Sequence, residues 1–144
     1  MRHSELRVSY NKVILSPPLI SSDDAYRYFM GVWDKGTLEL QERIYIACLN
    51  RDSEVIGHNC VGIGTDDSCL CDLSFIMAIA VVCRAKKLII AHNHPSGKTE
   101  PSDLDMVFTE KISVVSTLLA IEFVDHIILS KLGYYSFKGH NLVV

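Results

Sequence analysis

The sequence has no excess of positive charge and no long apolar run. Its 14 basic and 17 acidic residues give a net charge of −3 and a pI near 6.0, so it lacks the basic footprint of a tight nucleic-acid binder. The longest strongly apolar stretch in the middle of the chain, residues 75–83, is too short to span a bilayer. Residues 1–10 show no apolar signal-peptide core. We therefore expect a cytoplasmic protein without a membrane segment.

The sequence also lacks a disulfide framework, internal repeats and low-complexity segments. An odd number of cysteines without scaffold spacing predicts reduced thiols: Cys48, Cys60, Cys69, Cys71 and Cys83. The pair Cys69 and Cys71 is weak evidence for a metal site, because no second pair of metal-binding residues accompanies it. The 144 residues suffice for a single hydrophobic core. We expect an N-terminal arm over residues 1–20 and one domain over residues 21–144.

Hydrophobic periodicity predicts strands that alternate with helices in the second half of the chain. Capping residues at 21–24 predict a helix through about Trp33, and strands are expected at 43–49, 54–63, 88–92, 124–129 and 134–137. A helix from Asp72 to about Ala85 is apolar around most of its circumference, which predicts burial. A further helix opens at Ser102, and its expected buried stripe is Leu104, Val107, Phe108, Val115, Leu118 and Leu119. The order of elements favours an α/β sandwich with a mixed sheet flanked by helices.

The apolar strand that ends near His92 runs into the segment 93–97, Asn-His-Pro-Ser-Gly. Side chains two apart on a strand point to the same face, so His92 and His94 project together if the strand stays extended through His94. Two imidazoles at one strand end are two nitrogen ligands for a divalent metal. The alternative is that the segment is a turn and nothing more, because its composition is typical of turns.

A carboxylate on the next predicted helix offers a third ligand. Ser102 and Asp105 are three residues apart and face the same way across one helical turn. Asp105 also borders Leu104 of the expected apolar stripe, which would turn its carboxylate partly inward and complete a His-His-Asp set with one position left for water. The alternative is a capping box, with Ser102 at the N-cap and Asp105 in place of the usual glutamate. The coincidence of both features with the histidines favours the metal set.

The spacing H-x-H-P-x6-S-x-x-D resembles the metalloprotease signature of the JAB/MPN (JAMM) domain, whose positions are filled by His92, His94, Pro95, Ser102 and Asp105. The longer string HNHPSG, followed by Pro-Ser, is similar to the RadC-like branch of that superfamily. The resemblance extends from about residue 21 to the C-terminus. It implies a three-layer JAB/MPN (cytidine deaminase-like) sandwich. It also implies one zinc ion per chain, with His92, His94 and Asp105 as ligands.

The resemblance also calls for a glutamate at the edge of an early strand, a position that Glu42 fits and for which Glu39 is the second choice. The implied activity is that of a zinc-dependent hydrolase, a metallopeptidase or isopeptidase that cleaves an amide bond of a protein or peptide with a metal-activated water. Glu42 would act as general base and then as general acid. Ser102 would donate a hydrogen bond to the developing oxyanion, a role that competes with capping its helix.

The chain departs from the longer RadC-like proteins, which carry an N-terminal region resembling helix-hairpin-helix DNA-binding modules. About twenty residues precede the expected domain here, too few for such a module. The chain also reads Leu-Ser-Phe at 73–75 where Pro-Arg-Glu is usual, and Asn50 stands where an aspartate is common. We expect these two departures to alter surface or partner contacts and to leave metal binding intact.

Other functions stay open on the sequence alone. The family's association with DNA repair suggests a DNA repair-associated accessory protein with a structural or vestigial metal site, or a metal-dependent nuclease, although the net charge does not support DNA binding. We expect His126 to be a structural histidine, with a role beside the metal ligands as the alternative. Exposed edge strands leave peptide addition and homo-oligomer formation open.

Overall fold

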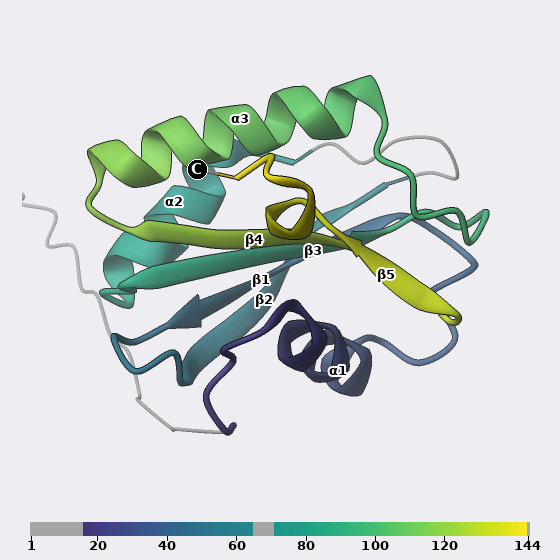
Figure 1. The fold of residues 1–144 in the computed structure, drawn as a ribbon, viewed down its shortest axis with the longest axis horizontal. Coiled ribbons are helices and arrows are strands. Elements are labelled where there is room, and N and C mark those ends of the chain that lie inside the picture. The colour runs from purple at the N-terminus through teal and green to yellow at the C-terminus, as the bar shows by residue number, and fades with distance from the viewer. Residues whose placement is uncertain (1–15, 65–70, 144) are drawn as a thin grey trace, which may run out of the picture.

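In a computed structural model, which describes residues 16–64 and 71–143, a mixed β-sheet separates two layers of helix (Figure 1). The strands are β1 (Arg43–Leu49), β2 (Val55–Ile63), β3 (Lys87–Asn93), β4 (Glu122–Ser130) and β5 (Gly133–Ser136). Helix α1 (Ser22–Val32) covers one face, while α2 (Leu73–Val82) and α3 (Asp103–Leu118) cover the other; the 3-10 turn η1 (Lys138–His140) follows β5. The predicted sandwich, with its mixed sheet between helices, is confirmed.

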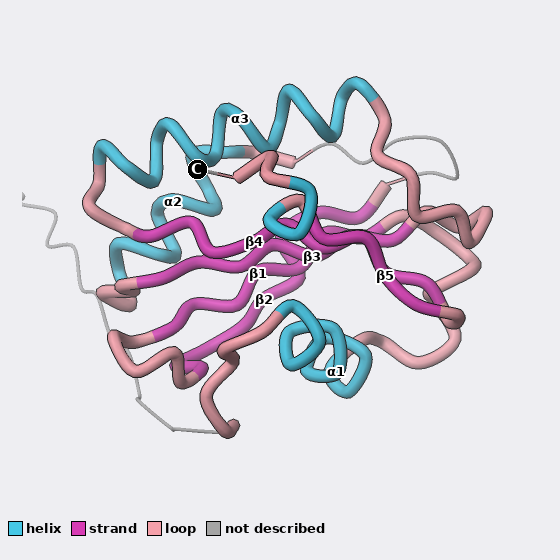
Figure 2. Tube along the Cα trace, in the orientation of Figure 1, coloured by secondary structure: helices cyan, strands magenta, loops and turns pink. Residues whose placement is uncertain are grey.

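The strands lie in the order β2-β1-β3-β4-β5 (Figure 2). Among the described strands, β3 and β4 run parallel and the other neighbouring pairs run antiparallel. The parallel pair is joined through α3, which crosses from the end of β3 back to the start of β4 (Figure 1). Because α3 begins where β3 ends, its first turn lies beside the carboxyl end of the central strand. Any side chains on those two segments therefore meet at one edge of the sheet.

Alternation along the central strands divides the core into two parts. On β1, Ile44, Ile46 and Cys48 pack toward α2 and α3, whereas the intervening residues pack toward α1. On β3, Leu88 and Ile90 likewise face α2 and α3. The same parity places His92 on the α3 side of the sheet.

Helix α1 matches the prediction from its capping residues. The Ser21 hydroxyl accepts a hydrogen bond from the Asp24 backbone N–H, and the Asp24 carboxylate accepts one from the Ser21 backbone N–H. The helix buries Ala25 and Phe29 against the sheet and ends at Trp33. The residues at 21–24 were therefore sufficient to predict where this helix begins.

The expectation that α2 is buried on most sides was wrong. Its N-cap is Asp72, as predicted, but it ends three residues before Ala85 and buries only Ile76, Met77 and Ala80. The side chains of Phe75, Val81 and Val82 are exposed on its outer side. A helix that lies on one face of a sheet buries a single stripe, and an all-apolar sequence does not show which stripe that is.

The apolar stripe predicted for α3 was also wrong. Four of its six residues are exposed: Leu104, Val107, Leu118 and Leu119. The helix instead buries Thr109, Ile112 and Ser116. The side chain of Asp105, four residues before Thr109, is only 14% exposed and extends this buried face toward the N-terminus of the helix. Asp105 therefore faces inward as predicted, but it does so as part of a stripe that contains polar residues.

Some features of the sequence lie outside the described residues. These are most of the expected N-terminal arm, which is described only from residue 16, and Cys69 of the Cys-x-Cys pair. The four described cysteines are free thiols: Cys48, Cys60, Cys71 and Cys83. Across residues 16–64 and 71–143, every helix is too short or too polar to cross a bilayer.

Candidate metal centre

Strand register brings Glu42 to the histidines. Strands β1 and β3 pair antiparallel, with Ile44 opposite His92. Continuing this register by two residues places Glu42 opposite His94, just beyond the end of each strand. Because side chains two apart share a face, Glu42 lies on the same side of the sheet as Ile44 and His92, which is the side that α3 covers.

Asn93 holds this end of the sheet together from the opposite face. Its side-chain oxygen accepts a hydrogen bond of 2.8 Å from the Arg43 backbone N–H. Its amide nitrogen donates to the carbonyl oxygens of Leu38, at 2.6 Å, and Gln41, at 3.0 Å. These bonds fix the segment that carries Glu42 against the strand that carries His92, so one buried amide positions the two residues relative to each other.

His94 follows the last residue of β3 and begins a turn. The Gly97 backbone N–H donates to the His94 carbonyl at 2.8 Å, and Gly97 has a φ of +77°, a conformation that favours glycine. The Nε2 atoms of His92 and His94 lie 3.0 Å apart. The predicted turn and the predicted pair of imidazoles are therefore both present, because the turn begins at the second histidine.

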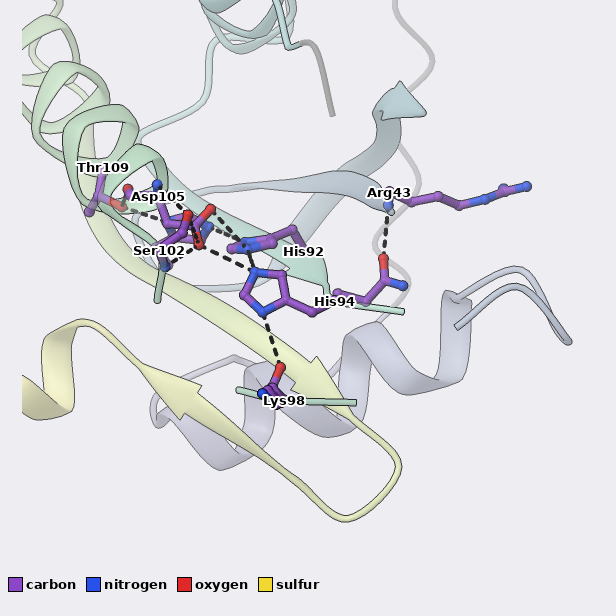
Figure 3. Close-up of polar contacts among 9 residues, drawn as sticks. Arg43, His92, His94, Lys98, Ser102, Asp105 and Thr109 are labelled. Carbon is purple, nitrogen blue, oxygen red and sulfur yellow. Dashed lines mark hydrogen bonds and ion pairs between the residues drawn. The ribbon is translucent and has the colours of Figure 1, made fainter. Parts of the chain in front are cut away.

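Asp105 is held by the capping box of α3. The Ser102 hydroxyl accepts from the Asp105 backbone N–H at 3.2 Å, and the Ser102 backbone N–H donates to Asp105 Oδ2 at 2.7 Å. The two carboxylate oxygens then reach the histidines, with Oδ1 3.2 Å from His92 Nε2 and Oδ2 3.3 Å from His94 Nε2 (Figure 3). The sequence left capping and metal ligation open as alternatives; the structure shows the cap and leaves the carboxylate oxygens placed beside both histidines.

The predicted residues converge on one point. One potential ligand atom from each of Glu42, His92, His94 and Asp105 lies within 4.8 Å of all the others. We call these four residues the candidate metal centre. Glu39, the second choice for the glutamate, lies outside this group; it is exposed and forms an ion pair with Lys131.

The candidate metal centre attracts positive charge. Burial by itself raises the pKa of Asp105, but hydrogen bonding with His92 and His94 outweighs burial and holds that pKa far below its usual range. The hydrogen bond with Asp105 raises the pKa of His94. Both shifts mean that the cluster is stabilised when one positive charge lies among its ligand atoms.

The donor set fits a divalent cation. The Nδ1 atom of His94 lies 3.1 Å from the Lys98 carbonyl oxygen, which can only accept, so Nδ1 carries the hydrogen (Figure 3). In the neutral ring Nε2 therefore presents its lone pair to the cluster. That lone pair faces the Asp105 carboxylate at 3.3 Å, an arrangement that a cation between them stabilises. Two imidazole nitrogens with a carboxylate are common ligands of zinc.

Burial gives Glu42 the chemistry of a proton acceptor. The residue is partly buried, and burial raises the pKa of its carboxyl group above the ordinary value for glutamate. The nearby imidazoles of His92 and His94 lower the pKa of Glu42, which partly offsets the effect of burial. A carboxylate with a raised pKa accepts and returns a proton more readily near neutral pH.

The structure shows Ser102 engaged in its cap. Its hydroxyl donates to Asp105 Oδ2 at 2.8 Å while it accepts from the Asp105 backbone N–H. The contact between Ser102 and an oxyanion stays a prediction. Ser102 is exposed, and its hydroxyl lies beside Asp105 of the candidate metal centre.

His126 contacts the candidate metal centre directly, although a purely structural histidine was the favoured expectation. The residue is 1% exposed, and its Nε2 atom lies 2.7 Å from His92 Nδ1. Its Nδ1 atom lies 2.6 Å from the Thr109 hydroxyl on α3. The available signal was a polar pair, Asp125 and His126, within an otherwise apolar strand. The strand pairing that brings it beside β3 is a long-range feature.

The fold and this cluster define a class of protein, an α/β sandwich whose central strand, turn and helix present a Glu-His-His-Asp set at one edge of the sheet. The chain belongs to the RadC-like JAB domain family, whose family model matches residues 19–142.

Curated relatives agree with this assignment. The chain is 36% identical over 98 residues to a UPF0758 protein of Thermotoga maritima, an alignment that covers 68% of this chain and 44% of the relative. It is 35% identical over 127 residues to a UPF0758 protein of Streptococcus equi subsp. zooepidemicus, covering 88% and 55%. A UPF0758 protein of Chlorobium phaeovibrioides is 33% identical over 118 residues, covering 82% and 52%. The chain spans about half the length of these relatives.

Proposed function

We propose that this protein is a zinc-dependent hydrolase of the JAMM type that cleaves an amide bond in a protein or peptide. The observation that carries the proposal is the convergence of Glu42, His92, His94 and Asp105, with ligand atoms all within 4.8 Å of one another. Membership of the RadC-like JAB domain family supports the same assignment. Surrounding loops select the substrate in such folds, so the proposal concerns the reaction type.

His92, His94 and Asp105 are the residues that would hold the metal ion. A zinc ion with three protein ligands acts as a Lewis acid and lowers the pKa of water to about 7. Glu42 is then available as the general base, because three ligands already suffice for a catalytic zinc site. Its carboxylate would accept the proton of the attacking water and return it to the leaving amine.

Ser102 can cap its helix and serve the reaction at once. Capping uses a lone pair of the hydroxyl oxygen, which accepts from the Asp105 backbone N–H. The single hydroxyl hydrogen is now donated to Asp105 Oδ2, an oxygen that also accepts from the Ser102 backbone N–H. Turning that hydrogen toward a substrate oxygen would leave Oδ2 with its backbone donor. Capping the helix and donating to an oxyanion therefore compete only for the direction in which the Ser102 hydroxyl hydrogen points.

Metal analysis combined with a peptide-cleavage screen tests the proposal. Protein purified without chelators is expected to contain one zinc per chain, and Glu42→Gln is expected to retain zinc while losing about 10²–10⁴-fold in cleavage rate. Glu39→Gln is the matched control, because Glu39 is exposed and paired with Lys131, and it is expected to behave like the unmodified protein.

Absence of stoichiometric zinc, or full activity in Glu42→Gln, would contradict the proposal. Single- and double-stranded DNA are included as substrates with chelator controls. Chelator-sensitive cleavage of DNA without cleavage of any peptide would also contradict it and favour a metal-dependent nuclease.

A further inference from the structure

A chain of three buried side chains leads from helix α3 to the His92 ligand. The Thr109 hydroxyl lies 2.6 Å from the Asp105 backbone carbonyl and 2.6 Å from His126 Nδ1. The other ring nitrogen of His126, Nε2, lies 2.7 Å from His92 Nδ1. Each contact is short enough for a strong hydrogen bond.

The donor and the acceptor of each hydrogen bond in this series follow from the first bond, between Thr109 and the Asp105 carbonyl. A carbonyl oxygen only accepts, so the Thr109 hydroxyl donates its single hydrogen to the Asp105 carbonyl. Thr109 must therefore accept from His126, which places the hydrogen of His126 on Nδ1 and leaves Nε2 as an acceptor. His92 must then donate from Nδ1, and its Nε2 is left with a lone pair.

The surroundings of His126 keep this direction fixed. The ring stacks on Phe137, with centroids 4.6 Å apart and an interplanar angle of 11°. Phe108 meets it edge-on from α3, with centroids 6.2 Å apart. Since the imidazole is 1% exposed, water has little access to the ring nitrogens and cannot readily replace Thr109 or His92 as a partner.

We infer that His126, oriented by Thr109, is a positioning residue that holds His92 in the tautomer whose Nε2 lone pair faces the candidate metal centre. The inference rests on the proposed function, because a lone pair at that position matters when His92 is a metal ligand. Hydrogen bonds to the far nitrogen of a ligating histidine fix its tautomer and raise its basicity. The inference also explains why α3 buries a threonine on the face that packs against the sheet.

Three variants separate positioning from packing. His126→Phe keeps an aromatic ring between Phe108 and Phe137 but removes both hydrogen bonds. Thr109→Val removes the hydroxyl at the far end of the chain and leaves His126 in place. Thr109→Ser is the matched control, because it retains a hydroxyl. Folding of each variant is checked by its thermal unfolding, so that Thr109→Val carries the test if His126→Phe does not fold.

Two measurements decide the inference. Long-range proton–nitrogen NMR of the metal-free protein at mildly alkaline pH reads the tautomer of His92 without reference to activity. The hydrogen is expected on Nδ1 in the unmodified protein and in Thr109→Ser, with the other tautomer appearing in His126→Phe and Thr109→Val. Zinc affinity, from competition with a chelator, is expected to fall about 10–100-fold in His126→Phe and less in Thr109→Val.

The hydrogen of His92 found on Nε2 in the unmodified protein would overturn the inference. So would an unchanged tautomer in both His126→Phe and Thr109→Val. Failure of the proposed function is distinguishable, because it would appear as a lack of zinc binding in the unmodified protein. In that event the NMR result still decides how His126 orients His92.

Discussion

The Ser102 hydroxyl donates a hydrogen bond of 2.8 Å to Asp105 Oδ2 at the first turn of helix α3. The other oxygen of the same carboxylate lies 3.2 Å from His92 Nε2. Oδ2 of Asp105 therefore accepts the capping hydrogen bonds and also lies 3.3 Å from His94 Nε2. Because the cap restricts the carboxylate, Asp105 is oriented toward both histidines.

A matched pair of capping boxes separates these two contributions of Ser102. In α1, Ser21 donates to Asp24 Oδ2 at 2.7 Å, which repeats the pattern of Ser102 and Asp105. We expect Ser102→Ala and Ser21→Ala to lower the free energy of unfolding by a similar amount, about 1 kcal/mol each. Urea unfolding of the metal-free proteins measures both values.

Only Ser102→Ala is expected to slow catalysis as well, by the roughly 10²–10³-fold typical of a lost oxyanion donor. Equal activity of the two variants would show that Ser102 is a cap and nothing more.

Removing the charge of the third ligand is expected to abolish tight metal binding. Asp105→Asn keeps the size of the side chain but replaces a carboxylate by a neutral amide, which is a poor zinc ligand. Asp103→Asn is the control, because Asp103 lies in the same first helical turn and is exposed. Isothermal titration with zinc should show binding in the control and little or none in Asp105→Asn. Similar affinities for the two variants would exclude Asp105 from the ligand set.

Much of this fold could be predicted because its elements are set by local chemistry. The bounds of β1 and the caps of α1, α2 and α3 followed from residues within a few positions of each end. The buried face of α3 could not be predicted in the same way. Thr109 and Ser116 are buried there while Leu104 and Leu118 are exposed. A polar residue can be buried when partners satisfy it; the Thr109 hydroxyl contacts the Asp105 carbonyl one turn earlier and His126, which is 17 positions away.

The residues of the candidate metal centre also differ in how far they could be predicted from local sequence. His92, His94 and Asp105 lie within fourteen positions of one another, so their spacing along a strand, a turn and a helix could be interpreted locally. Glu42 was placed by family resemblance, and its position depends on the register between β1 and β3. The contact of His126 with His92 depends on the pairing of β3 with β4. Register and pairing are tertiary properties that a single sequence does not specify directly.

Cys83 is expected to react with alkylating reagents at lower pH than Cys48 and Cys71, whose pKa values are raised. A hydrogen bond with Cys48 lowers the pKa of Cys83 to about 7, and the same bond, together with burial, raises the pKa of Cys48. Both thiols line an apolar pocket of about 360 Å³ between α2 and the first two strands. The thiolate is the reactive form, so alkylation of Cys83 should rise with a midpoint near pH 7.

Mass mapping after timed exposure to iodoacetamide measures each cysteine separately. Cys48→Ala should raise the midpoint for Cys83, because it removes the donor that stabilises the thiolate. A midpoint that stays near pH 7 in that variant would show that Cys48 does not lower the pKa.

His58 is expected to lower the free energy of unfolding as the pH falls. His58 is exposed at the surface, but desolvation by its neighbours lowers its pKa below the ordinary value of 6.5, and its Nδ1 atom lies 2.7 Å from the Tyr28 hydroxyl. The unfolded chain therefore binds a proton more readily than the folded one. The stability from this residue is fully present above about pH 6.5 and is lost as the pH falls toward the folded-state pKa.

Unfolding free energies measured across that range, for the unmodified protein and for His58→Gln, test this expectation. The substitution should make the dependence on pH shallower. An NMR titration that places the pKa of His58 at or above 6.5 would contradict the predicted sign.

The occupancy of the candidate metal centre is the most direct test of the proposed function. Crystals of protein purified without chelators, measured on both sides of the zinc absorption edge, would locate the ion. We predict one anomalous peak per chain, about 2.0–2.2 Å from His92 Nε2, His94 Nε2 and an oxygen of Asp105, with Glu42 close by and not required as a ligand. A crystal soaked in zinc that shows no peak at these residues, or a peak only at the cysteines, would contradict it.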